Sequence, residues 1–124
     1  MDIGQVRRDM AAIDAGRWVD SKELPELRDV RIKAKGLGSS EARDAVAKMQ
    51  RDGVDGNLAV QRVTNTVCFM EIEGLTKAGE SVTADGIRDQ LEDPAMEPLA
   101  LLILQAVALV DKTREAKAKA QSKN

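Results

Sequence analysis

Residues 99–110 read LALLILQAVALV, and this stretch decides how the rest of the chain must fold. Eleven of its twelve residues are apolar, and only Gln105 interrupts the run. At 100° per residue, the apolar residues divide between two opposite faces of a helix. One face carries Leu99, Leu102, Ile103, Ala106 and Val110, and the other carries Leu101, Leu104 and Ala108. A helix that is apolar on two sides needs cover on both.

The sequence leaves two interpretations of this helix open. It is either the central core helix, covered on all sides, or a helix with one face in the core and the other at an interface. In the second interpretation, the face with Leu101, Leu104 and Ala108 binds another protein or a second copy of the chain. We therefore expect a homo-oligomer, with these three residues and Trp18 as candidates for partner binding or self-association.

Capping signals place the helices. Asp93-Pro94 is typical of a helix start, because Asp is a good N-cap and Pro fits the first helical position. The last helix is therefore predicted from Pro94 to about Lys117. Either Ser39 or Ser40 is predicted to cap one shorter helix upstream, and Thr83 is predicted to cap another.

Upstream of these helices, the sequence has the period of a strand. In residues 30–35, Val30, Ile32 and Ala34 fall on one face, and Arg31, Lys33 and Lys35 fall on the other. Together with the segment Arg17-Trp18-Val19, this alternation predicts a two-stranded hairpin over residues 16–36. An isolated hairpin is only marginally stable in water, so we expect helices to pack on a face that carries Trp18 and Ile32.

These elements predict an α+β fold that is mostly α, with an N-terminal two-stranded β-hairpin followed by four helices packed as a small bundle. Residues 57–74 are counted among the helices, although their β-branched residues leave a strand possible there. A chain of 124 residues is expected to form one domain, over residues 1–118. Its parts are an arm or short helix at 1–15, the hairpin at 16–36, the helical part at 39–117 and a frayed basic tail at 118–124.

The composition removes much catalytic chemistry. The chain has no His and a single Cys, Cys68, which excludes Ser-His-Asp and Cys-His nucleophilic systems, multi-cysteine zinc sites and an internal disulfide. Cys68 lies among apolar residues and is predicted to be a buried, inert thiol. Gly36-Leu37-Gly38 lacks the third glycine of a dinucleotide fingerprint, and the segment 52–57 lacks the spacing of an EF-hand. We expect a protein that is not an enzyme and uses no cofactor and no metal.

The net charge of −2 gives no global reason to expect nucleic-acid binding. One local exception is a basic face formed by Arg31, Lys33 and Lys35, with Arg17 nearby. This face either contacts phosphate, as in a small nucleic-acid-binding regulator, or is the water-facing side of a strand whose lysines blunt its edge. The N-terminus has no apolar signal segment, and the longest apolar run is too short to cross a bilayer, so we expect a cytoplasmic protein with no membrane partner.

Several short motifs occur in a recognisable order. Gly16-Arg17-Trp18-Val19-Asp20 precedes the basic alternating strand, which ends in Gly36-Leu37. After a helix, Glu73-Gly74-Leu75-Thr76 leads through Gly79-Glu80 into a capped helix. This order, over roughly residues 16–110, resembles the tail assembly chaperones of long-tailed bacteriophages and prophages. The sequence departs from that pattern at Phe69-Met70-Glu71-Ile72, where an aromatic residue often directly precedes Glu-Gly.

The resemblance implies a mostly helical, non-enzymatic protein that acts in the bacterial cytoplasm and is absent from the mature virion. It implies two partners, namely the tape measure protein, which the chaperone keeps soluble, and the tail tube protein, whose assembly it assists. It also implies a longer form made by ribosomal frameshifting, with a junction in the Lys- and Ala-rich end at residues 112–124. An oligomeric structural subunit of the virion is a further alternative.

Overall fold

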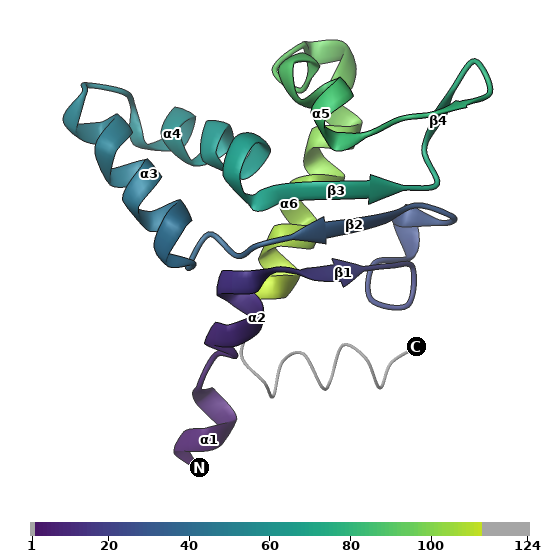
Figure 1. Ribbon diagram of the computed structural model, residues 1–124. Helices are drawn as coiled ribbons and strands as arrows, with labels where there is room; N and C mark the ends of the chain where they lie inside the picture. Colours follow the sequence, from purple (N-terminus) through teal and green to yellow (C-terminus); the bar gives the residue numbers. More distant parts are fainter. Residues whose placement is uncertain (1, 113–124) are drawn as a thin grey trace.

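The computed structural model describes residues 2–112 of the chain (Figure 1). Its α-helices are α1 (Ile3–Val6), α2 (Met10–Ala15), α3 (Ser40–Arg51), α4 (Gly56–Val63), α5 (Ala84–Ile87) and α6 (Glu97–Asp111). Its strands are β1 (Arg17–Val19), β2 (Arg31–Ala34), β3 (Phe69–Glu73), β4 (Thr76–Lys77) and β5 (Glu80–Ser81). Short 3-10 turns occur at Pro25–Leu27, Arg88–Gln90 and Pro94–Met96, and a π-helical turn occupies Thr64–Cys68.

The strands β1, β2 and β3 form an antiparallel sheet with β2 in the centre. The predicted mostly α fold and its N-terminal hairpin of β1 and β2 are confirmed. The helix predicted over residues 57–74 is wrong beyond Cys68, because the chain leaves the π-helical turn and enters β3. There Phe69 and Ile72 are buried against the partners Ala34 and Ile32 of β2. Pairing with β3 satisfies the second edge of β2, which a two-stranded hairpin would leave open.

The helix α6 crosses behind the three-stranded sheet and covers one of its faces (Figure 1). Val19, Ile32 and Ala34 point toward this covered face and are fully buried. The predicted face shared by Trp18 and Ile32 is wrong. In the antiparallel register Trp18 pairs with Lys33, and Val19 pairs with Ile32. Because cross-strand partners share a face and neighbours alternate, Trp18 lies on the sheet face opposite Ile32.

The predicted helix starts are borne out by side-chain caps. Ser39 accepts a hydrogen bond from the amide of Ala42, and Thr83 accepts one from the amide of Gly86. Asp93 caps in the same way, but the Pro94–Met96 turn is 3-10, so α6 itself begins at Glu97. The helix ends at Asp111, earlier than the predicted Lys117, and Lys112 is already extended. Residues 113–124, including the predicted tail and frameshift junction, lie outside the described residues.

A carboxylate at the end of α6 ties this helix to the turn after β2. Asp111 accepts hydrogen bonds from the amides of Leu37 (2.8 Å) and Gly38 (3.0 Å). A Cβ on Gly36 would overlap both the Asp111 carboxylate and the side chain of Ile13, so the close approach requires glycine. The turn that resembled a nucleotide-binding loop therefore holds an anion, and that anion belongs to the chain itself.

We expect Asp111→Ala to lower the free energy of unfolding by about 1.5–3 kcal/mol, because two backbone donors lose a charged acceptor. Chemical denaturation followed by circular dichroism measures this change. The matched control is Asp44→Ala, which removes an exposed carboxylate on α3 and should stay within about 0.5 kcal/mol of the parent. Equal stability of the two variants would show that the tie between α6 and the turn contributes nothing.

Candidate functional site

The helix α6 presents one apolar side to the core and a second to the surface. Ile103, Ala106 and Val107 are fully buried under the sheet. On the opposite side, Leu101 is 52% exposed, Leu104 is 41% exposed, and Ala108 is also exposed. The structure therefore shows which of the two apolar sides of α6 lies in the core and which is exposed. We call the exposed residues Leu101, Leu104 and Ala108 the apolar stripe.

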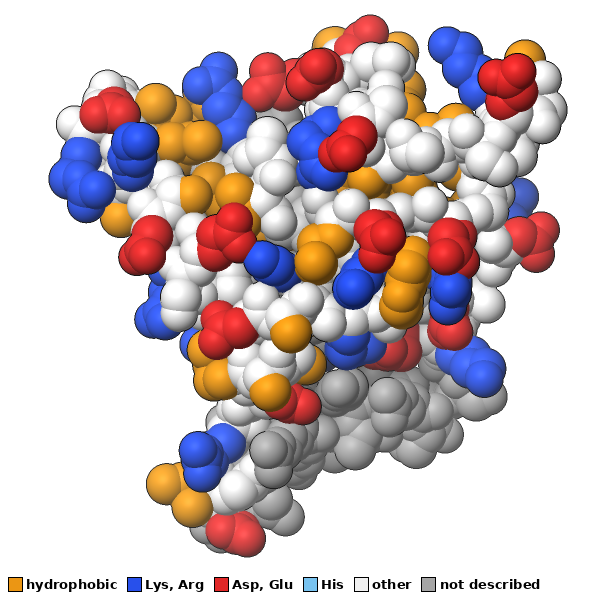
Figure 2. Space-filling view, viewed as in Figure 1, with side chains coloured by type: hydrophobic (Ala, Val, Ile, Leu, Met, Phe, Trp, Pro, Cys, Tyr) orange, Lys and Arg blue, Asp and Glu red, His pale blue; other side chains and the backbone are white. Residues whose placement is uncertain are grey.

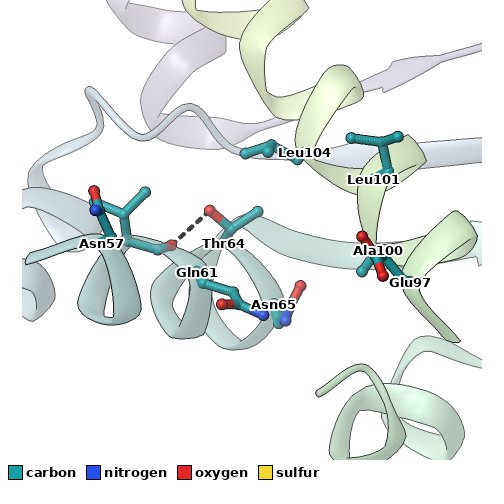
Figure 3. Close-up of a pocket in the computed structure, with 9 residues that line it drawn as sticks. Asn57, Gln61, Thr64, Asn65, Glu97, Ala100, Leu101 and Leu104 are labelled. Atoms are coloured by element: carbon teal, nitrogen blue, oxygen red, sulfur yellow. Dashed lines mark hydrogen bonds between the residues drawn. The ribbon is translucent and has the colours of Figure 1, made fainter. Parts of the chain in front are cut away.

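A groove lies beside the apolar stripe, between α6 and α4 (Figure 3). It encloses about 260 Å³, and Leu101 and Leu104 form part of its wall. The opposite wall carries amide and hydroxyl side chains. The other lining residues are Asn57, Val60, Gln61, Thr64, Asn65, Glu97 and Ala100. An apolar wall that faces polar groups suits an amphipathic occupant better than a purely apolar one.

Asn65 is the least expected residue of this groove. Its side chain is only 4% exposed, yet its Nδ2 atom has no hydrogen-bond acceptor among the described residues. The neighbouring Thr64 hydroxyl is engaged, because it donates to the backbone oxygen of Val60 at 2.7 Å. Sequence reasoning missed Asn65 because residues 57–74 were assigned to a regular helix, whereas the π-helical turn sets where this side chain lies.

A second groove lies at the other end of the stripe. Gln105, Ala108 and Lys112 line it from the α6 side. Residues 23–26, in the connection between β1 and β2, line it from the other side. Its volume is about 380 Å³. The apolar stripe is thus flanked by grooves toward both ends of α6.

The apolar character of α6 also passes a simple test for a membrane span. Pro94–Asp111 is long and apolar enough to cross a bilayer by length and composition alone. Core helices of soluble proteins pass the same test. One side of α6 packs on the sheet, and 28% of the Pro94–Asp111 span is buried in the fold.

Trp18 does not join the apolar stripe. It is half-buried on the sheet face opposite α6, and the guanidinium of Arg31 lies 4.2 Å from the centre of its ring. Such stacking covers the indole with a cation from the same sheet. Of the four candidates for partner binding, the structure brings together Leu101, Leu104 and Ala108, and it places Trp18 elsewhere.

The four residues of the predicted basic face are each paired with a carboxylate. Arg31 binds Glu73, Lys33 lies 3.6 Å from Glu71, and Lys35 binds Glu41. In Figure 2, basic and acidic side chains lie next to one another over the strands. A face in which each cation has an adjacent anion has little net field to attract phosphate.

Arg17 does not share that face. Its guanidinium points toward the helix side of the sheet, where it binds Glu23 through two hydrogen bonds and donates to the backbone oxygen of Leu109. The side chains of Arg17 and Glu23 are 16% and 10% exposed, so this pair belongs to the packing between β1 and α6. Arg17 is therefore separated from Arg31, Lys33 and Lys35.

The ion pair between Arg31 and Glu73 links the edge strand β3 to the central strand. A hydrogen bond from Arg31 lowers the pKa of Glu73, and the positive charge of Arg31 adds to this effect. The same hydrogen bond raises the pKa of Arg31. Because the folded-state pKa of Glu73 is lowered, its contribution to stability is present above the ordinary glutamate pKa. It is lost as the pH falls through the lowered value.

We expect Arg31→Gln to raise the pKa of Glu73 toward its ordinary value, because the hydrogen bond and the neighbouring charge are both lost. A carboxyl-detected NMR titration of Glu73 measures the change. Lys77→Gln, at an exposed lysine in β4, is the control and should leave the Glu73 titration where it is. An unchanged Glu73 pKa in Arg31→Gln would contradict the pairing.

Cys68 is fully buried at the end of the π-helical turn. Burial, with a smaller contribution from the negative charge of Asp111, raises the pKa of its thiol to about 12. The thiol therefore stays protonated near neutral pH, as predicted for an inert core cysteine.

We expect the folded protein not to react with a thiol-specific disulfide reagent at mildly alkaline pH, and one thiol to react once denaturant is added. Absorbance of the released chromophore measures both states. A Ser81→Cys variant is the positive control, since this position in β5 is exposed and should react at once. Rapid reaction of Cys68 without denaturant would show that the core opens readily.

Other sequence motifs have structural roles. Asp55 accepts hydrogen bonds from the amides of Asn57 and Leu58, so it caps α4. Within residues 2–112, no three His, Cys, Asp or Glu side chains come together as metal ligands.

Arg88, which the sequence did not single out, donates to the backbone oxygens of Asn65 and Phe69 and holds the junction between α4 and β3. Nothing in its local sequence signals this long-range contact.

Comparison with protein-family models, with curated proteins and with solved structures finds no match to this chain.

Proposed function

We propose that this chain is a non-enzymatic tail assembly chaperone of a long-tailed phage or prophage. In this role it binds apolar helical segments of the tape measure protein in the bacterial cytoplasm and assists assembly of the tail tube. The motif order over residues 16–110 supports the assignment to this class. The apolar stripe on α6 is the observation that carries the proposed binding activity.

The exposed leucine side chains of α6 favour association with an apolar partner. Burying a leucine side chain stabilises a complex by about 1.5–3 kcal/mol, so exposed leucines on a rigid helix favour association. The stripe presents Leu101 and Leu104 one turn apart, with Ala108 one turn further on. This spacing fits a partner helix that carries its own apolar stripe. Such a contact keeps an aggregation-prone helix soluble by covering its apolar side.

The alternative of a nucleic-acid-binding regulator gains no support from the sheet. Its basic residues are neutralised by neighbouring carboxylates, and Arg17 is turned toward α6. The structure offers a contact surface at α6 instead. The resemblance also leads us to propose that the protein acts in the host cytoplasm and is absent from purified particles, whereas a virion subunit would be found in them.

We expect co-expression with the tape measure protein of a neighbouring gene to raise the soluble fraction of that protein. Leu101→Glu and Leu104→Glu should abolish the increase, because each places a charge in the apolar contact. Sedimentation of lysates and quantitative immunoblotting measure the soluble fraction.

The matched control is Ser81→Glu, which adds the same charge at an exposed position in β5, away from α6. It should support solubility as well as the parent does. The proposal fails if the tape measure protein is equally insoluble with and without the parent chain while both are well expressed.

A further inference from the structure

The charges on the exposed side of α6 are arranged in a self-complementary way. Glu97 lies at the first turn, and Lys112 follows the last. Within the described part of the chain, neither side chain has an ion-pair partner. Between them lies the apolar stripe. Two such helices side by side in opposite directions would place the acidic end of each beside the basic end of the other, with the apolar residues in contact between them.

The spacing along α6 is that of a helix-pairing seam. Glu97, Leu101, Leu104 and Ala108 follow one another at intervals of four, three and four residues. This alternation keeps the four side chains along one side of a helix that packs nearly parallel or antiparallel to another. At 1.5 Å per residue, Glu97 and Lys112 are roughly 22 Å apart along the axis.

We propose that α6 pairs with α6 of a second copy of this chain, antiparallel, about a two-fold axis between Leu101 and Leu104. In this arrangement Leu101 of one copy faces Leu104 of the other, and Glu97 faces Ala108. Lys112 lies one turn beyond Ala108, so each Glu97 meets the Lys112 of its mate. The contact is isologous and closed, because the same surface serves on both copies.

The antiparallel direction follows from electrostatics. A parallel pair would place Glu97 beside Glu97 and Lys112 beside Lys112, which is repulsive at both ends. The antiparallel pair makes two attractive pairs and sets the helix dipoles head to tail. Only the antiparallel orientation therefore pairs the two charges that have no ion-pair partner within residues 2–112.

The grooves beside the stripe also fit this partner. The last turn of any α-helix leaves backbone carbonyls without helical partners. In the antiparallel pair, the last turn of the mate lies near Glu97, at the groove that contains the unpaired Nδ2 of Asn65. The two grooves extend the contact beyond a single helix, toward the roughly 800 Å² per partner of a stable dimer.

Self-pairing also regulates the surface used under the proposed function. A second copy and the apolar helix of a client occupy the same stripe, so dimerisation masks the stripe until a client displaces the mate. This regulatory consequence depends on the proposed function, whereas the dimer itself does not. The experiment below uses the isolated chain, so its result is independent of any client.

The test is the mass of the isolated chain as a function of concentration, measured by light scattering and sedimentation equilibrium. We expect the parent to reach twice its monomer mass of 13.4 kDa. Leu101→Glu and Leu104→Glu should weaken the dimer by roughly 100-fold or more, since two leucine contacts are lost per dimer. Ser81→Glu should dimerise as the parent does. Circular dichroism checks that each variant is folded.

Charge reversal tests the orientation. Glu97→Lys and Lys112→Glu should each weaken the dimer by about 2- to 30-fold, because two exposed pairs become repulsive. The double variant Glu97→Lys/Lys112→Glu should dimerise again like the parent. A parent that stays monomeric at every concentration overturns the proposal, as does an oligomer larger than two. A dimer that tolerates both leucine substitutions, or a double variant no better than the single ones, also overturns it.

Discussion

The packing of α6 on one face of the three-stranded sheet is the contact on which the rest of the structure depends. The sheet has short strands; α6 packs on β1 and β2, and α5 packs on β3. Polar contacts fix the C-terminal end of this helix: Asp111 accepts two backbone hydrogen bonds from the turn after β2, and Arg17 donates to the backbone oxygen of Leu109. The orientation of α6 then fixes which of its side chains remain outside.

This constraint explains why the chain has surplus apolar surface. A helix of this composition is apolar on both sides, whereas a small sheet covers only one. Among the other helical segments, α2 and the π-helical turn contact α6, and Leu101 and Leu104 stay exposed. The same geometry creates the groove with the unpaired amide of Asn65. The exposed leucines and the neighbouring groove therefore both follow from the way α6 packs in the core.

On the sheet face opposite α6, carboxylates of β3 lie across from the cations of β2. The alternation of residues 30–35 predicts a basic face on the strand that became β2. With β3 as a neighbour, Glu71 and Glu73 lie directly opposite Lys33 and Arg31. The two strands neutralise one another, and the remaining field is small.

Sequence patterns predict the mostly α composition, the hairpin, the helix caps and the two apolar sides of the last helix. These features depend on residues close together in the chain, where periodicity and capping act. Tertiary structure alone decided that residues 69–73 form a strand, which face Trp18 occupies, where Arg88 and Asp111 bind, and which side of α6 stays exposed. Each of these outcomes depends on a partner far away in sequence. Local preference at residues 63–72 allowed both helix and strand, and the open edge of β2 made the choice.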